Sequence, residues 1–187
     1  ASSSWFRPHM DFPWCHKRTP GQLKSRVGKE RHHTLWLFYK ADHLIDYVKK
    51  NGFTHVEIMP ITQYPFDGSW GYQATGFFSV DSRYGNPKQL MSFVDRLHQA
   101  GIGVILDFVL VHFATDPFGL VKWDGSNLYE GVGDAEKSQW GSYLFDLGKD
   151  PVRSFLMSSV NFFITDFHFD GIRFDAISNV ISSFLIW

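Results

Sequence analysis

The stretch IGVILDFV, residues 102–109, is apolar almost without interruption. A strand that is covered on one face alternates apolar and polar residues, whereas a parallel strand covered on both faces is apolar along its whole length. The stretch therefore predicts a buried parallel strand. Its one charged residue, Asp107, lies near the carboxyl end of that strand.

Helices and further strands surround this stretch in a repeating order. Apolar residues at helical spacing predict three helices, between Ala41 and Gly52, between Asn86 and Gly101, and from Asp150-Pro151 onward. Asn86-Pro87 is a strong helix start, because Asn caps the first turn and Pro fits the first helical position. Each helix precedes a strand, at 53–61, 102–109 and 171–177.

The connections are short after the helices and long after the strands. This asymmetry is typical of a parallel β/α barrel, in which the loops after the strands carry the chemistry. A doubly wound sheet is the alternative, but no Gly-rich phosphate loop follows any of the strands. Three units cannot close an eight-stranded barrel. The sequence therefore predicts roughly the first half of a (β/α)8 TIM barrel over residues 38–187, after an irregular or misframed segment, residues 1–37.

Composition restricts the classes of partner. The 187 residues are 44% hydrophobic, carry a formal net charge of −1 and include a single cysteine, Cys15. No apolar stretch has the roughly 20 residues that span a bilayer, and no signal peptide is recognisable. The basic run 16–33 could be an arm for an anionic ligand, but without aromatic platforms it is better explained as a solvated or misframed segment. We expect a cytoplasmic protein with no nucleic-acid and no membrane partner.

Two opposite charges stand inside the apolar strand GIRFDAI, residues 171–177. The two-residue period of a strand places Arg173 and Asp175 on the same side. Buried charges have to be paired, and an arginine beside a carboxylate keeps that carboxylate ionised. An ionised, fixed carboxylate is what a retaining glycosidase or transglycosylase needs as its nucleophile. The spacing alone is equally compatible with an ion pair that only ties one strand to its neighbour.

Longer motifs favour the first interpretation. DFVLVH at 107–112 and DGIRFDA at 170–176 resemble two signature regions of the α-amylase superfamily of glycoside hydrolases and glucanotransferases. Three longer stretches resemble, more narrowly, the 1,4-α-glucan branching enzymes: EIMPITQYPFDGSWGYQATGFFSVDSRYG (57–85), HFATDPFGLVKWDGSNLYE (112–130) and NFFITDFHFDGIRFDAIS (161–178). The resemblance covers roughly residues 35–180.

The resemblance implies a role for each matched residue. Asp175 is implied as the nucleophile that forms a covalent glucosyl intermediate, and Arg173 as the residue that orients it. His112 is implied to hydrogen-bond sugar hydroxyls, Asp107 to brace Arg173, and Tyr72 to stack its ring on the sugar. Two further residues of the SWGYQ motif, Trp70 and Gln73, are implied as wall residues of the site. For Trp70, packing within the loop is almost as good an explanation.

Other residues are not assigned to a site. We expect five phenylalanines to be core residues rather than a glucan platform: Phe77, Phe78, Phe108, Phe162 and Phe163. No histidine or cysteine spacing suggests metal ligation, so neither a metal nor a cofactor is expected.

The chain departs from the family pattern near both ends. The family's first barrel strand, Tyr-Glu-x-His-x-Gly-Ser, is replaced by the unrelated stretch from Asp11 to Trp36, and the family's general acid and second stabilising aspartate are expected beyond Trp187. Neither Glu57 nor Glu130 is a substitute for that acid. We therefore expect a segment of a branching enzyme, a retaining glucanotransferase that cleaves α-1,4 chains and forms α-1,6 branches in glycogen biosynthesis. The substrates of such an enzyme are glycogen, amylose or starch-like chains. Because the general acid is missing, we expect the segment to be inactive alone. The alternatives are a non-catalytic remnant with weak glucan binding and a fragment of a related α-glucan hydrolase.

Overall fold

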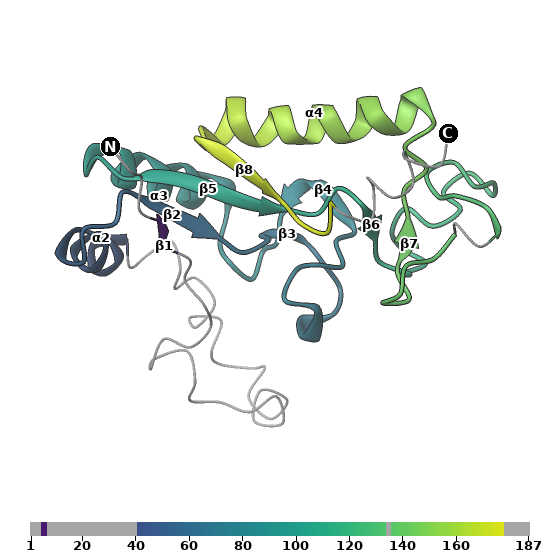
Figure 1. The fold of residues 1–187 in the computed structure, drawn as a ribbon, viewed down its shortest axis with the longest axis horizontal. Coiled ribbons are helices and arrows are strands. Elements are labelled where there is room, and N and C mark those ends of the chain that lie inside the picture. Colours follow the sequence, from purple (N-terminus) through teal and green to yellow (C-terminus); the bar gives the residue numbers. More distant parts are fainter. Residues whose placement is uncertain (1–4, 7–40, 134–135, 178–187) are drawn as a thin grey trace.

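A computed structural model describes residues 5–6, 41–133 and 136–177 (Figure 1). Most of the segment predicted to be irregular, residues 1–37, lies outside the described residues, as does the end of the chain from 178 onward. The exception is a two-residue strand, β1 (Trp5–Phe6), which pairs in parallel with β2 (His55–Ile58). A strand this short has no periodicity, so the sequence analysis did not predict it.

The fold is organised around a parallel sheet with the strand order β1-β2-β5-β8. β5 (Gly103–Phe108) lies between β2 and β8 (Gly171–Phe174), and both neighbours run parallel to it. All residues of β5 after Gly103 are buried, which confirms the strand that the apolar stretch 102–109 predicts. The carboxyl ends of β5 and β8 therefore open at the same edge of the sheet (Figure 1).

Three helices alternate with these strands. They are α2 (Ala41–Lys50), α3 (Pro87–Gln99) and α4 (Asp150–Phe167). α3 packs against β5 and against both other helices, and α4 also packs against β4 and passes over β8 (Figure 1). The predicted start of α3 is confirmed: Asn86 accepts a hydrogen bond from the backbone of Gln89, whose side chain accepts one from the backbone of Asn86.

The packing of α4 shows which face of β5 is turned toward the helices. Phe108 of β5 contacts Phe163 of α4, with ring centroids 5.9 Å apart, so Phe108 points to the helical layer. Because side chains alternate along a strand, the preceding residue, Asp107, points to the opposite face. Of the five phenylalanines expected in the core, three are buried there and Phe162 is partly buried against it. The fifth expectation is wrong: the Phe78 side chain is 44% exposed and contacts the rings of Phe155 and Phe162.

The two long loops contain short elements that the sequence analysis treated as loop. The loop after β2 holds β3 (Thr62–Gln63), the 3-10 turn η1 (Asp67–Ser69) and β4 (Gly76–Val80). The loop after β5 holds β6 (His112–Phe113) and β7 (Tyr143–Leu144), which pair antiparallel. Both loops lie at the carboxyl edge of the parallel sheet, where they can enclose a site.

Candidate active site

The candidate site forms where β5 and β8 end side by side. Asp107 and Arg173 are register partners on these two strands, so their side chains share one face of the sheet. Arg173 Nη1 donates to Asp107 Oδ1 at 2.8 Å and to Asp175 Oδ1 at 2.6 Å. One guanidinium nitrogen thus joins a fully buried carboxylate, Asp107, to a partly exposed one, Asp175.

The backbone fixes Asp175 as well. Its N–H donates to the carbonyl of Phe108 at 3.1 Å, which extends the pairing of β8 with β5 by one residue beyond the strand. The Asp175 carboxylate is therefore held by a backbone contact and a charged hydrogen bond, while part of it faces solvent. A substrate can reach this carboxylate but not the buried Asp107.

The charge of Arg173 is permanent. Burial alone lowers the pKa of Arg173, but the hydrogen bonds and charges of Asp107 and Asp175 raise it by a larger amount. The pKa of Arg173 is therefore above its usual range. The guanidinium is therefore a cation at any pH at which the protein is handled. Both carboxylates face a positive charge that titration does not remove.

Tyr72 reaches the same cluster from the loop after β2. Its hydroxyl donates to Asp107 Oδ2 at 2.6 Å, so Asp107 accepts Arg173 on one oxygen and Tyr72 on the other. The residue before it, Gly71, has a φ of +90°, and a Cβ there would lie 2.5 Å from the carbonyl oxygen of Pro60. Only a glycine lets the loop approach the end of β2 this closely.

His112 lies at the start of β6 and is buried. Burial lowers the pKa of His112 from its usual value of 6.5, and the negative charge of Asp175 opposes only part of this effect. The imidazole is therefore neutral at pH 7. Its Nδ1 is buried and has no hydrogen-bond partner among the described residues.

One aromatic residue of this site was missed by the sequence analysis. The Trp140 ring lies 5.4 Å from the His112 ring, centroid to centroid, and remains 48% exposed. A tight turn presents it: Gly141 N–H donates to the Ser138 carbonyl at 3.0 Å, and the Ser138 and Ser142 hydroxyls are hydrogen-bonded. A glycine directly after Trp140 is compatible with a turn, but no sequence pattern indicates that this turn lies beside His112.

The remaining sequence-predicted residues lie at the edge of the cluster. Trp70 follows η1, with a φ of +55° and a half-exposed side chain, and Gln73 follows Tyr72 and is half-buried. Within the described part of the chain, neither side chain is hydrogen-bonded to the Asp107–Arg173–Asp175 cluster. Their assignment as wall residues stays a prediction.

Glu130 has a structural environment. It is fully buried, and its carboxylate accepts hydrogen bonds from the backbone N–H groups of Lys122 at 2.9 Å and Tyr129 at 3.2 Å. These contacts close the loop around it. A carboxyl group used in this way is not exposed to a sugar, which agrees with leaving Glu130 out of the acid role.

Comparison with known proteins identifies the family. Residues 41–140 match the family model described as the α-amylase catalytic domain. The chain belongs to the α-amylase family. The matched range includes Tyr72, Asp107 and His112, together with the loops that surround them.

Curated relatives of this α-amylase-family chain carry a more specific name. The 1,4-α-glucan branching enzyme GlgB of Nitrosomonas europaea is 45% identical over 184 residues, which cover 95% of this chain and 25% of that protein. The enzyme of the same name from Geobacillus stearothermophilus is 52% identical over 143 residues, covering 75% of this chain and 22% of that protein. The chain thus spans about a quarter of the length of the curated relatives it matches.

Solved structures agree on the fold. A putative α-amylase from Salmonella typhimurium superposes with a TM-score of 0.66 at 30% identity, over 76% of this chain and 24% of that one. The α-amylase of Geobacillus thermoleovorans, solved with acarbose, gives 0.60 at 25% identity, over 74% of this chain and 33% of that one. The predicted partial β/α barrel is confirmed. Among the described residues, no helix has the length and apolar character needed to cross a membrane.

Proposed function

We propose that this chain is the part of a 1,4-α-glucan branching enzyme that binds an α-1,4-glucan and provides the catalytic nucleophile. The observation that carries the proposal is the position of Asp175. Arg173 holds this carboxylate at 2.6 Å, with part of it exposed, at the carboxyl edge of the sheet. The names of the curated relatives support the choice of reaction.

The reaction starts with attack by Asp175. Its carboxylate oxygen forms a bond to the anomeric carbon of a glucose unit, and the bond from that carbon to the α-1,4 oxygen breaks with its electron pair on the oxygen. A general acid protonates this oxygen; none of the described residues is assigned to that role. A 6-hydroxyl of a glucan then attacks the same carbon, loses its proton to the conjugate base, and releases Asp175. Two inversions give a retained α-1,6 linkage.

The other residues of the site bind the sugar. The neutral His112, which lies beside the exposed Trp140 ring, is the residue we assign to hydrogen-bonding a sugar hydroxyl. The Tyr72 ring is held by its hydroxyl on Asp107, so its face has a fixed orientation toward a sugar ring. Arg173 holds the nucleophile in place by donating to Asp175 Oδ1 at 2.6 Å. A cytoplasmic location, with no nucleic-acid or membrane partner, remains our expectation for such an enzyme.

A hydrolase is the second candidate. The superposed structures are a putative α-amylase from Salmonella typhimurium and the α-amylase of Geobacillus thermoleovorans, which are 30% and 25% identical to this chain. Hydrolysis and transfer share the Asp175 step and differ in whether water or a sugar hydroxyl resolves the intermediate. New α-1,6 linkages without a rise in reducing ends identify transfer. A chain that binds glucan but whose Asp175 does not react with α-maltosyl fluoride fits the non-catalytic alternative.

Trp140 provides a test of glucan binding. We expect the chain to bind maltoheptaose, and Trp140→Ala to raise the dissociation constant about five- to tenfold, since losing a stacked aromatic face costs about 1 kcal/mol. Isothermal titration calorimetry measures both constants. Trp140→Phe keeps an aromatic face and is expected to stay within about twofold of the original affinity.

Trp123→Ala is the matched control for this test. Trp123 is a tryptophan of the same long loop, 67% exposed, and it contributes to the wall of a separate hollow with Phe118. We expect no change in affinity. A chain that does not bind maltoheptaose at all would contradict the proposed function, whereas an unaltered affinity in Trp140→Ala would remove only Trp140 from the site.

A further inference from the structure

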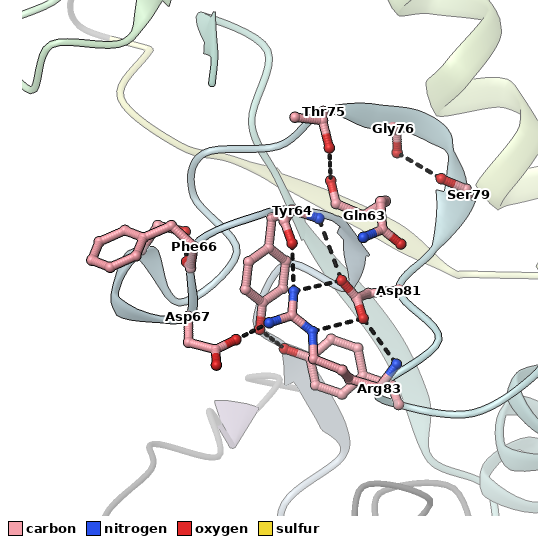
Figure 2. A network of polar contacts seen from close by, with 11 residues as sticks. Gln63, Tyr64, Phe66, Asp67, Thr75, Gly76, Ser79, Asp81 and Arg83 are labelled. Atoms are coloured by element: carbon pink, nitrogen blue, oxygen red, sulfur yellow. Dashed lines mark hydrogen bonds and ion pairs between the residues drawn. The ribbon is translucent and has the colours of Figure 1, made fainter. Parts of the chain in front are cut away.

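The loop that carries Tyr72 is tied together by one arginine, Arg83 (Figure 2). Arg83 follows β4 by three residues and lies against the buried Asp81, whose side chain is 1% exposed. Asp81 accepts from the backbone N–H of Arg83 at 2.9 Å, from Nε at 2.8 Å and from Nη2 at 2.6 Å. The two contacts from Nε and Nη2 make a bidentate ion pair, which fixes the guanidinium at the end of the loop.

Arg83 then reaches back to the beginning and the middle of the loop. Its guanidinium lies 3.9 Å from the centroid of the Tyr64 ring, and Nη2 donates to the Tyr64 carbonyl. Its Nη1 forms an ion pair with Asp67, the first residue of η1 (Figure 2). One side chain therefore joins three points of the loop, Tyr64, Asp67 and Asp81.

A short chain of hydrogen bonds leads from Asp67 to the site. Trp70 N–H donates to the Asp67 carbonyl at 3.1 Å, and Tyr72 N–H donates to the Ser69 carbonyl at 3.0 Å. Tyr72 in turn donates to Asp107 at 2.6 Å. These overlapping contacts close the η1 turn between Asp67 and Tyr72.

The two aspartates that bind Arg83 differ in how far their side chains are exposed. Asp81 is buried, and its pairing with Arg83 belongs to the core of the loop. The Asp67 side chain is 82% exposed, and an ion pair at so exposed a carboxylate contributes little to folding stability. The Asp67 side chain can therefore be removed without unfolding the loop, whereas the buried Asp81 cannot.

We propose that Asp67 is a positioning residue for glucan binding: its ion pair with Arg83 holds η1 in place and so fixes the Tyr72 ring over the site. The role of the ring rests on the proposed function, whereas the restraint on η1 does not. Asp67 touches no substrate; it acts through Tyr72.

The first test measures the restraint without any ligand. In Asp67→Ala we expect amide hydrogen exchange of Trp70 and Tyr72 to be about two- to fivefold faster, because the η1 turn opens more often. The matched control is Asp42→Ala, which removes another exposed aspartate from a long-range ion pair, the one with Arg96 between α2 and α3. It is expected to leave exchange in η1 unchanged. Equal exchange in Asp67→Ala and the original chain would overturn the proposal, whatever the chain binds.

The second test measures the path through Tyr72. Asp67→Ala is expected to raise the maltoheptaose dissociation constant about three- to fivefold, with a melting temperature within about 2 °C of the original. In a Tyr72→Ala background the same substitution is expected to have no further effect, because the group it positions is absent. An equal loss of affinity in both backgrounds would mean that Asp67 acts elsewhere, and would overturn the assignment.

Discussion

Asp107→Ala is expected to lower the free energy of unfolding by about 2–3 kcal/mol, because it removes a buried, charged acceptor that binds two side chains of the described part of the chain. Arg173 and Tyr72 both donate to this carboxylate, at 2.8 and 2.6 Å. Arg173 keeps Asp175 as a partner and is partly exposed, so it can be rehydrated, and this holds the loss below the maximum for a broken buried ion pair. Urea denaturation followed by circular dichroism measures the change.

Asp42→Ala is the reference for an aspartate that has an arginine partner but is exposed. We expect it to cost less than about 1 kcal/mol. Asp107→Ala is also expected to weaken maltoheptaose binding at least tenfold, because Tyr72 and Arg173 both lose their anchor. If the two substitutions cost the same and leave binding unaltered, Asp107 does not organise the site.

Gly71→Ala is expected to lower the free energy of unfolding by about 2–4 kcal/mol and to weaken maltoheptaose binding more than tenfold. Part of the cost is backbone strain, since an alanine disfavours a φ of +90°. The larger part is steric: the new Cβ would lie 2.5 Å from the Pro60 carbonyl oxygen, so the loop has to move away from β2. Tyr72 is the next residue, and the same movement takes its hydroxyl from Asp107.

Gly52→Ala separates strain from displacement. Gly52 ends α2 with a φ of +71°, and a Cβ there meets nothing within 4 Å. Its replacement is expected to cost about 1–2 kcal/mol from the backbone alone and to leave glucan binding unchanged. Chemical denaturation and calorimetry on both variants make the comparison. Equal stability losses with unchanged binding in both would show that Gly71 has no role in placing Tyr72.

The parallel strands β2, β5 and β8 and the helices between them were predictable because each has a local signal. β5 is apolar except for Asp107, and Asn86, Pro87 and Gln89 mark the start of α3. The cluster of Asp107, Arg173 and Asp175 was also within reach. The two-residue period puts Arg173 and Asp175 on one side, and neighbouring parallel strands bring their carboxyl ends to one edge.

Features that depend on contacts between distant segments were not predictable. β6 and β7 are two residues each and exist only through their pairing, 30 residues apart along the chain. The contact of Trp140 with His112 depends on that pairing. Likewise, nothing in the SRYG motif indicated that Arg83 would bind Asp67 as well as Asp81, because both loop ends must first fold together.

Covalent trapping of the nucleophile tests the central claim most directly. α-Maltosyl fluoride loses fluoride without protonation, so attack by a carboxylate needs no general acid and leaves one maltosyl group as an ester. Mass spectrometry of the intact chain and of its peptides locates the group. We predict a single maltosyl group on Asp175, and no labelling in Asp175→Asn, which retains the size of the side chain. A chain that stays unlabelled, or a label that persists in Asp175→Asn, would contradict the assignment of Asp175 as the nucleophile.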